Sequence, residues 1–391
     1  MKDRTRLTIG FIPLADAAAL IVAVDKGFAA REGLEVDLVR EVSWSNVRDK
    51  LNLGLFDAAH LLAPVAVASS LGIGHVKVPI IAPYTLALNG NAITVSPGLW
   101  ADLAEAADGD LALPAVSARA FASVVAKRRA KSADPLTMGM TFPFSNHNYQ
   151  LRFWMAAGGV DPDDEVRLVV LPPPYMVESL ANGHVDGFCV GAPWNSVAVD
   201  LGVGRILHFG SEIVARMAEK VLAVRREWAR EHPDVLTQLV RAHEEAALFI
   251  ADPGNRDEVA SLLAAPARVD VPAEVLRRTL EGRLKVAPNG DVRASERYLL
   301  IGRQGASRPD PVQAAWTYAQ MVRWRQAPMS PDLLAATQDV FRPDLYDAAL
   351  GTDGSLVAGE PPDGIGAFTG PSFDSQDIGK YLSDWPAQRR A

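Results

Sequence analysis

The sequence predicts an α/β fold with two lobes and a ligand cleft between them. Strand-like and helix-like segments alternate along much of the chain, as they do in proteins built on a parallel sheet. The alternation comes in two series, and two extended segments connect one series with the other. Ligands bind open α/β sheets at the carboxyl ends of the strands. We therefore expect the binding site where the two lobes face each other.

The first lobe begins with the alternating segment "RLTIGFIP", which predicts a strand at residues 6–13. Similar patterns predict strands at 35–42, 56–62 and 77–88, and helices at 17–34, near 45–54 and at 63–72. The segment "NGNAITVSP" combines a turn with a short extended piece. We interpret it, at residues 89–97, as the crossing to the second lobe.

The second lobe repeats the pattern, and the extended segment "KVLAVRREW" at 220–228 indicates the return crossing. Strands are predicted at 136–142, 166–172, 185–191 and 205–210, with helices that include 146–157 and 175–183. Further helices are predicted at 233–252, 254–265, 272–282, 311–325 and 332–341, and a Gly-, Pro- and Asp-rich stretch from 351 onward predicts a wrapping tail. We thus expect lobe I at 1–92 and 220–391, with the helical extension and the tail, and lobe II at 93–219.

Composition excludes several classes of function. The chain has 391 residues, a net charge of −8 and a mean hydropathy of +0.05, whereas proteins that bind nucleic acid or anionic membranes directly are usually basic. Cys189 is the only cysteine, so neither an internal disulfide nor a cysteine-based metal site can form. Common catalytic and nucleotide-binding signatures are absent. We expect no cofactor, no metal, no direct nucleic-acid partner and no membrane partner.

The N-terminal residues indicate the cellular compartment of the protein. Leu7 already opens a strand, and no apolar segment of roughly 7–15 residues precedes it, as a secretory signal would require. No run approaches the roughly 18 apolar residues of a membrane span. These features predict a cytoplasmic protein, unless a leader was removed from the sequence.

The phrase "TFPFSNHNYQLRFW" places His147 in the first turn of a helix, directly after the potential capping residues Ser145 and Asn146. The free N–H groups and the positive dipole end of a helix favour an anion, and an imidazole donor would strengthen such a site. A partly exposed capping histidine without a ligand fits the same pattern.

Three other residues are candidates with equally plain structural explanations. Gly191 ends the apolar strand in "DGFCVGAPWN", where glycine permits close approach of a ligand but is more often a turn residue. Trp44 follows the second strand, and its indole N–H suits an anion, although a packing role explains it as well. Lys220 opens the return segment beside Glu219, where an exposed ion pair would also be expected.

Three longer stretches together carry a family resemblance. "TFPFSNHNYQLRFWMAAGGVDP", "PPPYMVESLANGHVDGFCVGAPWN" and "EKVLAVRREWAREHPDVL" resemble the nitrate- and bicarbonate-binding proteins of bacterial ABC transporters. The resemblance runs from "LTIGFIPLADAAALIVAVDKGF" to about residue 260 and implies a two-lobed fold like that of type II periplasmic binding proteins.

The resemblance also implies a binding set. In the nitrate binders the anion is held by a tryptophan, an amide side chain, a histidine, a glycine turn and a lysine. These roles fall on Trp44, Asn91, His147, Gly191 and Lys220. Asn91 departs from the pattern, because the nitrate binders usually have glutamine there, which is one methylene longer. Bicarbonate relatives bring an acidic residue and calcium near the lysine position, so Lys220 favours nitrate, and Glu219 keeps bicarbonate open.

Since no leader is visible, the resemblance points most closely to cytoplasmic nitrate/nitrite sensors of the NasS type. Such sensors hold an RNA-binding antiterminator of the NasT type, which has an ANTAR domain, and release it when the ligand binds. The alternative is a periplasmic nitrate, bicarbonate or sulfonate-binding component of an ABC transporter. An enzyme is the third reading, since pyrimidine-precursor synthases share this fold. Those synthases carry a cysteine-rich iron motif, which one cysteine cannot supply, so we expect no enzymatic activity.

Overall fold

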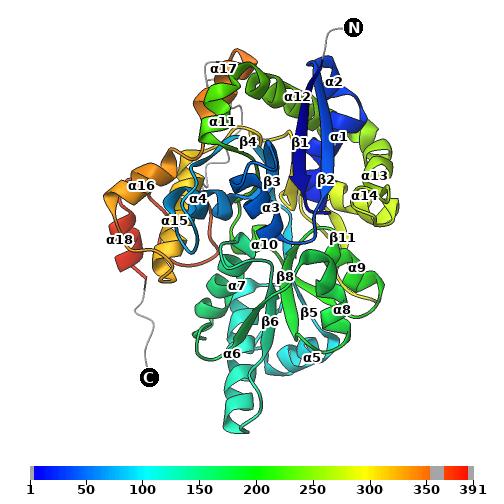
Figure 1. The fold of residues 1–391 in the computed structure, drawn as a ribbon. Helices are drawn as coiled ribbons and strands as arrows, with labels where there is room; N and C mark the ends of the chain where they lie inside the picture. Colours follow the sequence, from blue (N-terminus) through cyan, green and yellow to red (C-terminus); the bar gives the residue numbers. More distant parts are fainter. Residues whose placement is uncertain (1–3, 353–364, 386–391) are drawn as a thin grey trace. The chain divides into compact units, whose positions relative to one another are not determined.

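A computed structural model describes residues 4–352 and 365–385. The chain forms two compact units, each containing one mixed β-sheet covered by helices (Figure 1). Among the described residues, unit 1 comprises 4–89, 217–281 and 299–352, and unit 2 comprises 90–216, 282–298 and 365–385. Within the described part of the chain, no helix is both long and apolar enough to cross a membrane.

The sheet of unit 1 has six strands in the order β13-β4-β10-β3-β1-β2. Strand β1 runs parallel to β2 and β3, whereas β10 lies antiparallel between β3 and β4. The return segment predicted from the sequence is therefore a central strand of this sheet. The strands are β1 (Thr5–Phe11), β2 (Leu34–Arg40), β3 (Ala58–Leu62), β4 (Ile80–Asn89), β10 (Ala218–Arg225) and β13 (Leu299–Leu300).

Two groups of helices cover this sheet, with α1 against α12 and α13, and α4 against α15 and α16. The helix predicted at 17–34 is broken, because Gly27 adopts a left-handed conformation (φ 75°) that ends one helix and starts the next. The helices of unit 1 are η1 (Ala15–Ala17), α1 (Ala18–Asp25), α2 (Phe28–Arg31), α3 (Trp44–Asn52), α4 (Ala63–Leu71), α11 (Arg226–Glu231), α12 (Pro233–Ala251), η3 (Pro253–Asn255), α13 (Arg256–Ala264), α14 (Ala273–Glu281), α15 (Pro311–Arg323), α16 (Pro331–Gln338) and α17 (Pro343–Leu350).

Unit 2 contains a five-stranded sheet in the order β7-β6-β8-β5-β9. Strand β6 is parallel to β7 and β8, and β5 is antiparallel to β8 and β9, so the first crossing also becomes a sheet strand. The strands are β5 (Asn91–Val95), β6 (Thr137–Met140), β7 (Arg167–Val170), β8 (Gly187–Gly191) and β9 (Arg205–Phe209), with a hairpin of β11 (Arg283–Lys285) and β12 (Val292–Ala294).

The helices of unit 2 pack closely, most visibly where α6 meets the end of α7. A methyl group at Gly158 would lie 2.1 Å from the carbonyl oxygen of Ala118, so only glycine fits this contact. The helices are α5 (Pro97–Ala106), α6 (Pro114–Ala130), α7 (Asn146–Ala157), η2 (Pro173–Tyr175), α8 (Met176–Ala181), α9 (Trp194–Asp200), α10 (Gly210–Ile213) and α18 (Ile378–Ser383).

The predicted lobe boundaries need correction. The chain enters unit 2 after residue 89 and returns at 217, and the C-terminal part, which we assigned wholly to lobe I, is divided between the units. Segment 282–298 belongs to unit 2 because Val286 accepts a backbone hydrogen bond from Ile206 at 2.9 Å. Residues 365–385 also belong there, since Ala367 bridges Val214. The rest of the predicted wrapping tail, 353–364 and 386–391, lies outside the described residues.

Candidate functional site

In unit 1, the end of β2 leads into α3, whose first residue is Trp44. Ser43 caps the helix by accepting a hydrogen bond from the backbone N–H of Asn46 at 3.3 Å, which fixes Trp44 in the first turn. The Trp44 side chain is 1% exposed, and its indole nitrogen has no hydrogen-bond partner among the described residues. A buried donor without a partner is costly, so a ligand acceptor at this nitrogen would stabilise the site.

Lys220 lies beside Trp44, with its ammonium nitrogen 5.3 Å from the centre of the indole ring. The residue is fully buried on β10, between Leu62 of β3 and Ala87 of β4. The pairing register with β4 shifts on both sides of Lys220, and such a bulge redirects side chains. The structure therefore brings the predicted tryptophan and lysine together.

Lys220 is paired with two buried carboxylates. Its Nζ lies 2.9 Å from Oδ2 of Asp16 and 2.8 Å from Oε1 of Glu219. Burial lowers the pKa of Lys220, but the two negative charges outweigh burial and raise it above its usual value. Burial likewise opposes ionisation of Asp16, yet Lys220 and His60 bring its pKa down to about 2. Both groups are thus charged at neutral pH.

His60 on β3 completes this group in unit 1. Its Nε2 lies 2.9 Å from Oδ1 of Asp16, and its Nδ1 accepts the backbone N–H of Ile12 at 3.4 Å. Its ring centre is 5.4 Å from that of Trp44. Burial lowers the pKa of His60, and this effect exceeds the opposing influence of Asp16. The imidazole is therefore neutral at pH 7, with the proton on the nitrogen that faces Asp16.

In unit 2, His147 occupies the first turn of α7, as predicted. Ser145 caps this helix by accepting the backbone N–H of Asn148 at 3.1 Å. His147 is fully buried, with Nδ1 2.9 Å from the hydroxyl of Thr141, which follows β6. The alternative of a partly exposed capping histidine is therefore wrong.

Asn91 and Gly191 face each other across strands β5 and β8, where they form the first pair of the antiparallel register. The Asn91 amide nitrogen donates to Oε1 of Gln150 at 3.2 Å, and both side chains are fully buried. Gln150 lies one turn after His147 on α7, so Asn91, Gly191 and the start of α7 form a second group of polar residues.

The five predicted residues thus divide into Trp44 and Lys220 in unit 1, and Asn91, His147 and Gly191 in unit 2. The ion pair of Lys220 with Glu219 was expected, but as an exposed pair, whereas both side chains are buried. The sequence prediction missed the other partners of these residues, which are Asp16, His60, Thr141 and Gln150. One signal was available, because His60 in "DAAHLL" is a polar residue within an otherwise apolar strand. Within the described ranges, no group of three or more His, Cys, Asp or Glu residues could hold a metal ion.

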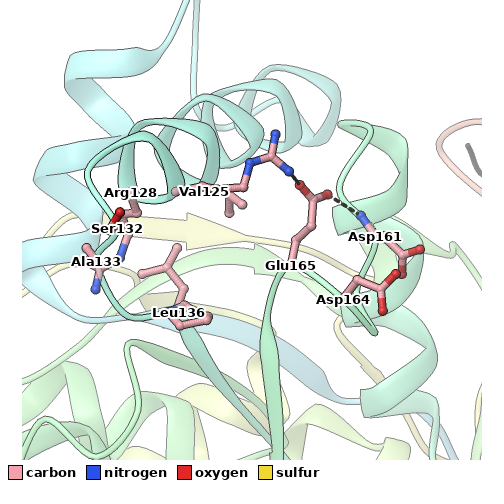
Figure 2. A pocket seen from close by; sticks show the side chains of 10 residues that line it. Val125, Arg128, Ser132, Ala133, Leu136, Asp161, Asp164 and Glu165 are labelled. Carbon is pink, nitrogen blue, oxygen red and sulfur yellow. Dashed lines mark hydrogen bonds and ion pairs between the residues drawn. The ribbon is translucent and has the colours of Figure 1, made fainter. Parts of the chain in front are cut away.

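A separate cavity of about 530 Å³ lies in unit 2 at the C-terminal end of α6 and holds none of the predicted residues (Figure 2). Arg129 in its lining pairs with Glu165 at 2.7 Å, and Glu165 also accepts the backbone N–H of Asp161 at 2.9 Å. Arg129 is 71% exposed. Since this cation is already paired and is exposed to water, the cavity is a weaker candidate for anion binding than the buried groups.

Known proteins resemble this chain over nearly its whole length. It is 34% identical to the nitrate import ATP-binding protein NrtC of Synechocystis, over 99% of this chain and 56% of that protein. The chain thus spans about half the length of NrtC. It is also 32% identical to the bicarbonate transport ATP-binding protein CmpC of Synechococcus elongatus, again over 56% of that protein's length. The nitrate/nitrite binding protein NrtA of Synechococcus elongatus is 30% identical over 96% of this chain and 85% of its own length.

Structural similarity agrees with the sequence comparison. The crystal structure of the periplasmic nitrate-binding protein NrtA from Synechocystis has a TM-score of 0.83 to this chain at 28% identity, covering 97% of this chain and 98% of that one. This confirms the predicted α/β fold of the periplasmic-binding-protein type. Residues 2–264, which are more than half of the chain, match the NMT1-like family. The chain is therefore a member of the NMT1-like family, homologous to the nitrate/nitrite- and bicarbonate-binding proteins.

Proposed function

We propose that this protein binds nitrate, and also nitrite, reversibly and without catalysing a reaction. The observation that carries the proposal is the buried pair of Trp44 and Lys220. The indole N–H has no hydrogen-bond partner among the described residues, and an ammonium group lies 5.3 Å from the centre of the same ring. Nitrate is a planar, weakly basic anion with a single charge, so a few neutral donors and one cation suffice to hold it. NrtA, which is named for binding nitrate and nitrite, supports the same ligand.

The donors of unit 2 extend this proposal. We propose that Asn91, His147 and the backbone at Gly191 also serve as donors to nitrate or nitrite. Bicarbonate is the second candidate, since it is also a monovalent anion and since CmpC is named for its transport.

We further propose that binding serves a regulatory output. The protein would act as a cytoplasmic sensor that holds an RNA-binding antiterminator with an ANTAR domain (NasT type) and releases it when nitrate binds. The net charge of −8 supports a protein partner over direct contact with RNA. The competing role is the substrate-binding part of a nitrate transporter, which the transport names of the relatives support.

Calorimetric titration with nitrate, nitrite, bicarbonate and sulfate tests the binding proposal. We expect one site per chain for nitrate, with no added metal. Trp44→Phe keeps the ring but removes the N–H donor, so nitrate affinity should fall roughly tenfold, the size of one hydrogen bond to a charged group. His147→Phe should weaken binding similarly, because the substitution removes the imidazole donor. Wild-type protein that binds no nitrate or nitrite would refute the proposed ligand.

Co-purification with an ANTAR-domain antiterminator, with and without nitrate, tests the output. The two ligands must oppose each other reciprocally, because coupling between two binding equilibria is symmetrical. The partner should therefore weaken nitrate binding by the factor by which nitrate weakens partner binding. A complex that is indifferent to nitrate, or no complex at all, would refute the sensor role and favour transport.

A further inference from the structure

Four buried ionisable side chains in unit 1 form one cluster near Trp44. Asp16 is 1% exposed, and His60, Glu219 and Lys220 are 0% exposed. Lys220 contacts both carboxylates at 2.8–2.9 Å, and His60 contacts Asp16 at 2.9 Å. These distances allow no water between the charges, so the groups act as one unit.

The two carboxylates of this cluster oppose the binding of an anion to Lys220. Asp16 and Glu219 contribute two negative charges, Lys220 contributes one positive charge, and His60 is neutral. Two carboxylates therefore lie within 3 Å of the one ammonium group. An isolated lysine would attract any anion, with a preference for higher charge, whereas this lysine has already been neutralised.

We infer that Asp16 and Glu219 are specificity-determining residues that restrict the site to monovalent anions and exclude sulfate and hydrogenphosphate. This inference rests on the proposed function, because it concerns the anion that Trp44 and Lys220 would bind. A monovalent anion uses the directed donors of Trp44 and Lys220 and adds a single charge to the cluster. A divalent anion brings two charges close to two buried carboxylates, and little water is present to screen the repulsion.

The two carboxylates make separate contributions that substitution can isolate. Asp16→Asn and Glu219→Gln each remove one negative charge while keeping the size of the side chain and its ability to accept a hydrogen bond. Either change leaves one carboxylate in contact with Lys220 instead of two. The affinity for sulfate should increase more than the affinity for nitrate, since the repulsion removed scales with the charge of the ligand.

Titration calorimetry at pH 7.5 on the full chain, with sodium nitrate and sodium sulfate at equal ionic strength, tests the inference. We expect the wild-type protein to bind nitrate at least roughly a hundredfold more tightly than sulfate. Each variant should reduce this ratio by roughly tenfold or more, mainly by tighter sulfate binding. Asp37→Asn is the matched control, because Asp37 is exposed on β2 and should leave the ratio unchanged.

The possible outcomes separate the inference from the proposed function. A nitrate-to-sulfate ratio that stays unchanged in both variants, while the wild type binds nitrate, overturns the role of the carboxylates and leaves nitrate binding intact. Wild-type protein that binds sulfate as tightly as nitrate also overturns the inference. Wild-type protein that binds neither nitrate nor nitrite overturns the proposed function, and the inference falls with it. If one variant fails to fold, the other still decides the result.

Discussion

Replacing Lys220 by methionine should destabilise the protein far more than an ordinary lysine substitution does. The change removes the ammonium that pairs with Asp16 and Glu219, and both carboxylates are buried. The pKa of Asp16 is lowered from an ordinary 3.8 to about 2, so its surroundings favour the charged form by about 2 kcal/mol. Leaving buried carboxylates without their cation costs about 3–5 kcal/mol in comparable cases, and we expect a loss of that size at pH 7.

Urea denaturation followed by far-ultraviolet circular dichroism measures the loss. In the wild type the pKa of Asp16 is lower in the folded state, so its stabilising contribution is present above about pH 3.8 and disappears as the pH falls toward 2. In Lys220→Met the carboxylates repel each other, which raises their pKa values in the folded state. The deficit relative to the wild type should therefore shrink as the pH is lowered from 7 to 4.5.

Two further variants make this test decisive. Adding Asp16→Asn and Glu219→Gln to Lys220→Met removes the stranded charges and should restore most of the lost stability. Lys77→Met is the control, because Lys77 is exposed in unit 1 and its replacement should change stability by less than about 0.5 kcal/mol. A loss below about 1 kcal/mol in Lys220→Met, or no recovery in the triple variant, would show that water already screens these charges and would refute the reasoning.

Three other predictions concern packing, acid stability and the second group of site residues. Gly158→Ala should destabilise the protein by about 1–3 kcal/mol in urea denaturation, because the added methyl meets the backbone of α6. Gly98→Ala is the control, since a methyl group there enters open space at α5 and should not destabilise the protein. Equal effects of the two substitutions would contradict the contact at Gly158. Burial lowers the pKa of His243 to about 4, so its contribution to stability is complete above about pH 6.5 and decreases by up to about 3 kcal/mol as the pH falls toward 4. His243→Phe should therefore flatten the melting temperature between pH 7 and 4.5, and an unchanged pH profile would show that the ring is not the acid-sensitive group. Gln150→Met should weaken nitrate binding roughly fivefold to tenfold by removing the acceptor that orients Asn91, and calorimetry showing wild-type affinity would exclude this role.

Local signals allowed much of the fold to be predicted. The helix expected at 146–157 matches α7, because a capping serine at its start and two glycines after its end define it within the sequence itself. The break at Gly27 was missed, since a glycine inside an apolar helical pattern does not reveal its φ angle. The assignment of 282–298 to unit 2 depends on hydrogen bonds between residues far apart in the chain, which periodicity does not encode.

The candidate site shows the same division between local and distant information. The sequence pointed to His147 through its helix start, and the family resemblance pointed to Trp44 and Lys220. Neither could reveal that Asp16 neutralises Lys220, because their contact arises only when β10 enters the sheet beside β3. The sequence prediction therefore named the cation and its neighbour Glu219, but neither Asp16 nor the burial of these charges.

The central position of β10 also bears on how the chain folds while it is being synthesised. Residues 90–216, which hold all five strands of the sheet in unit 2, are synthesised before the residues of β10. Until then β3 and β4 lack the strand that separates them in the finished sheet, and their edges can pair with other chains. We expect chains that end just before residue 218 to contain an incomplete unit 1 that is prone to aggregation. Chaperone binding to the nascent chain should then be strongest before residues 218–225 have emerged from the ribosome, and it should decline afterwards.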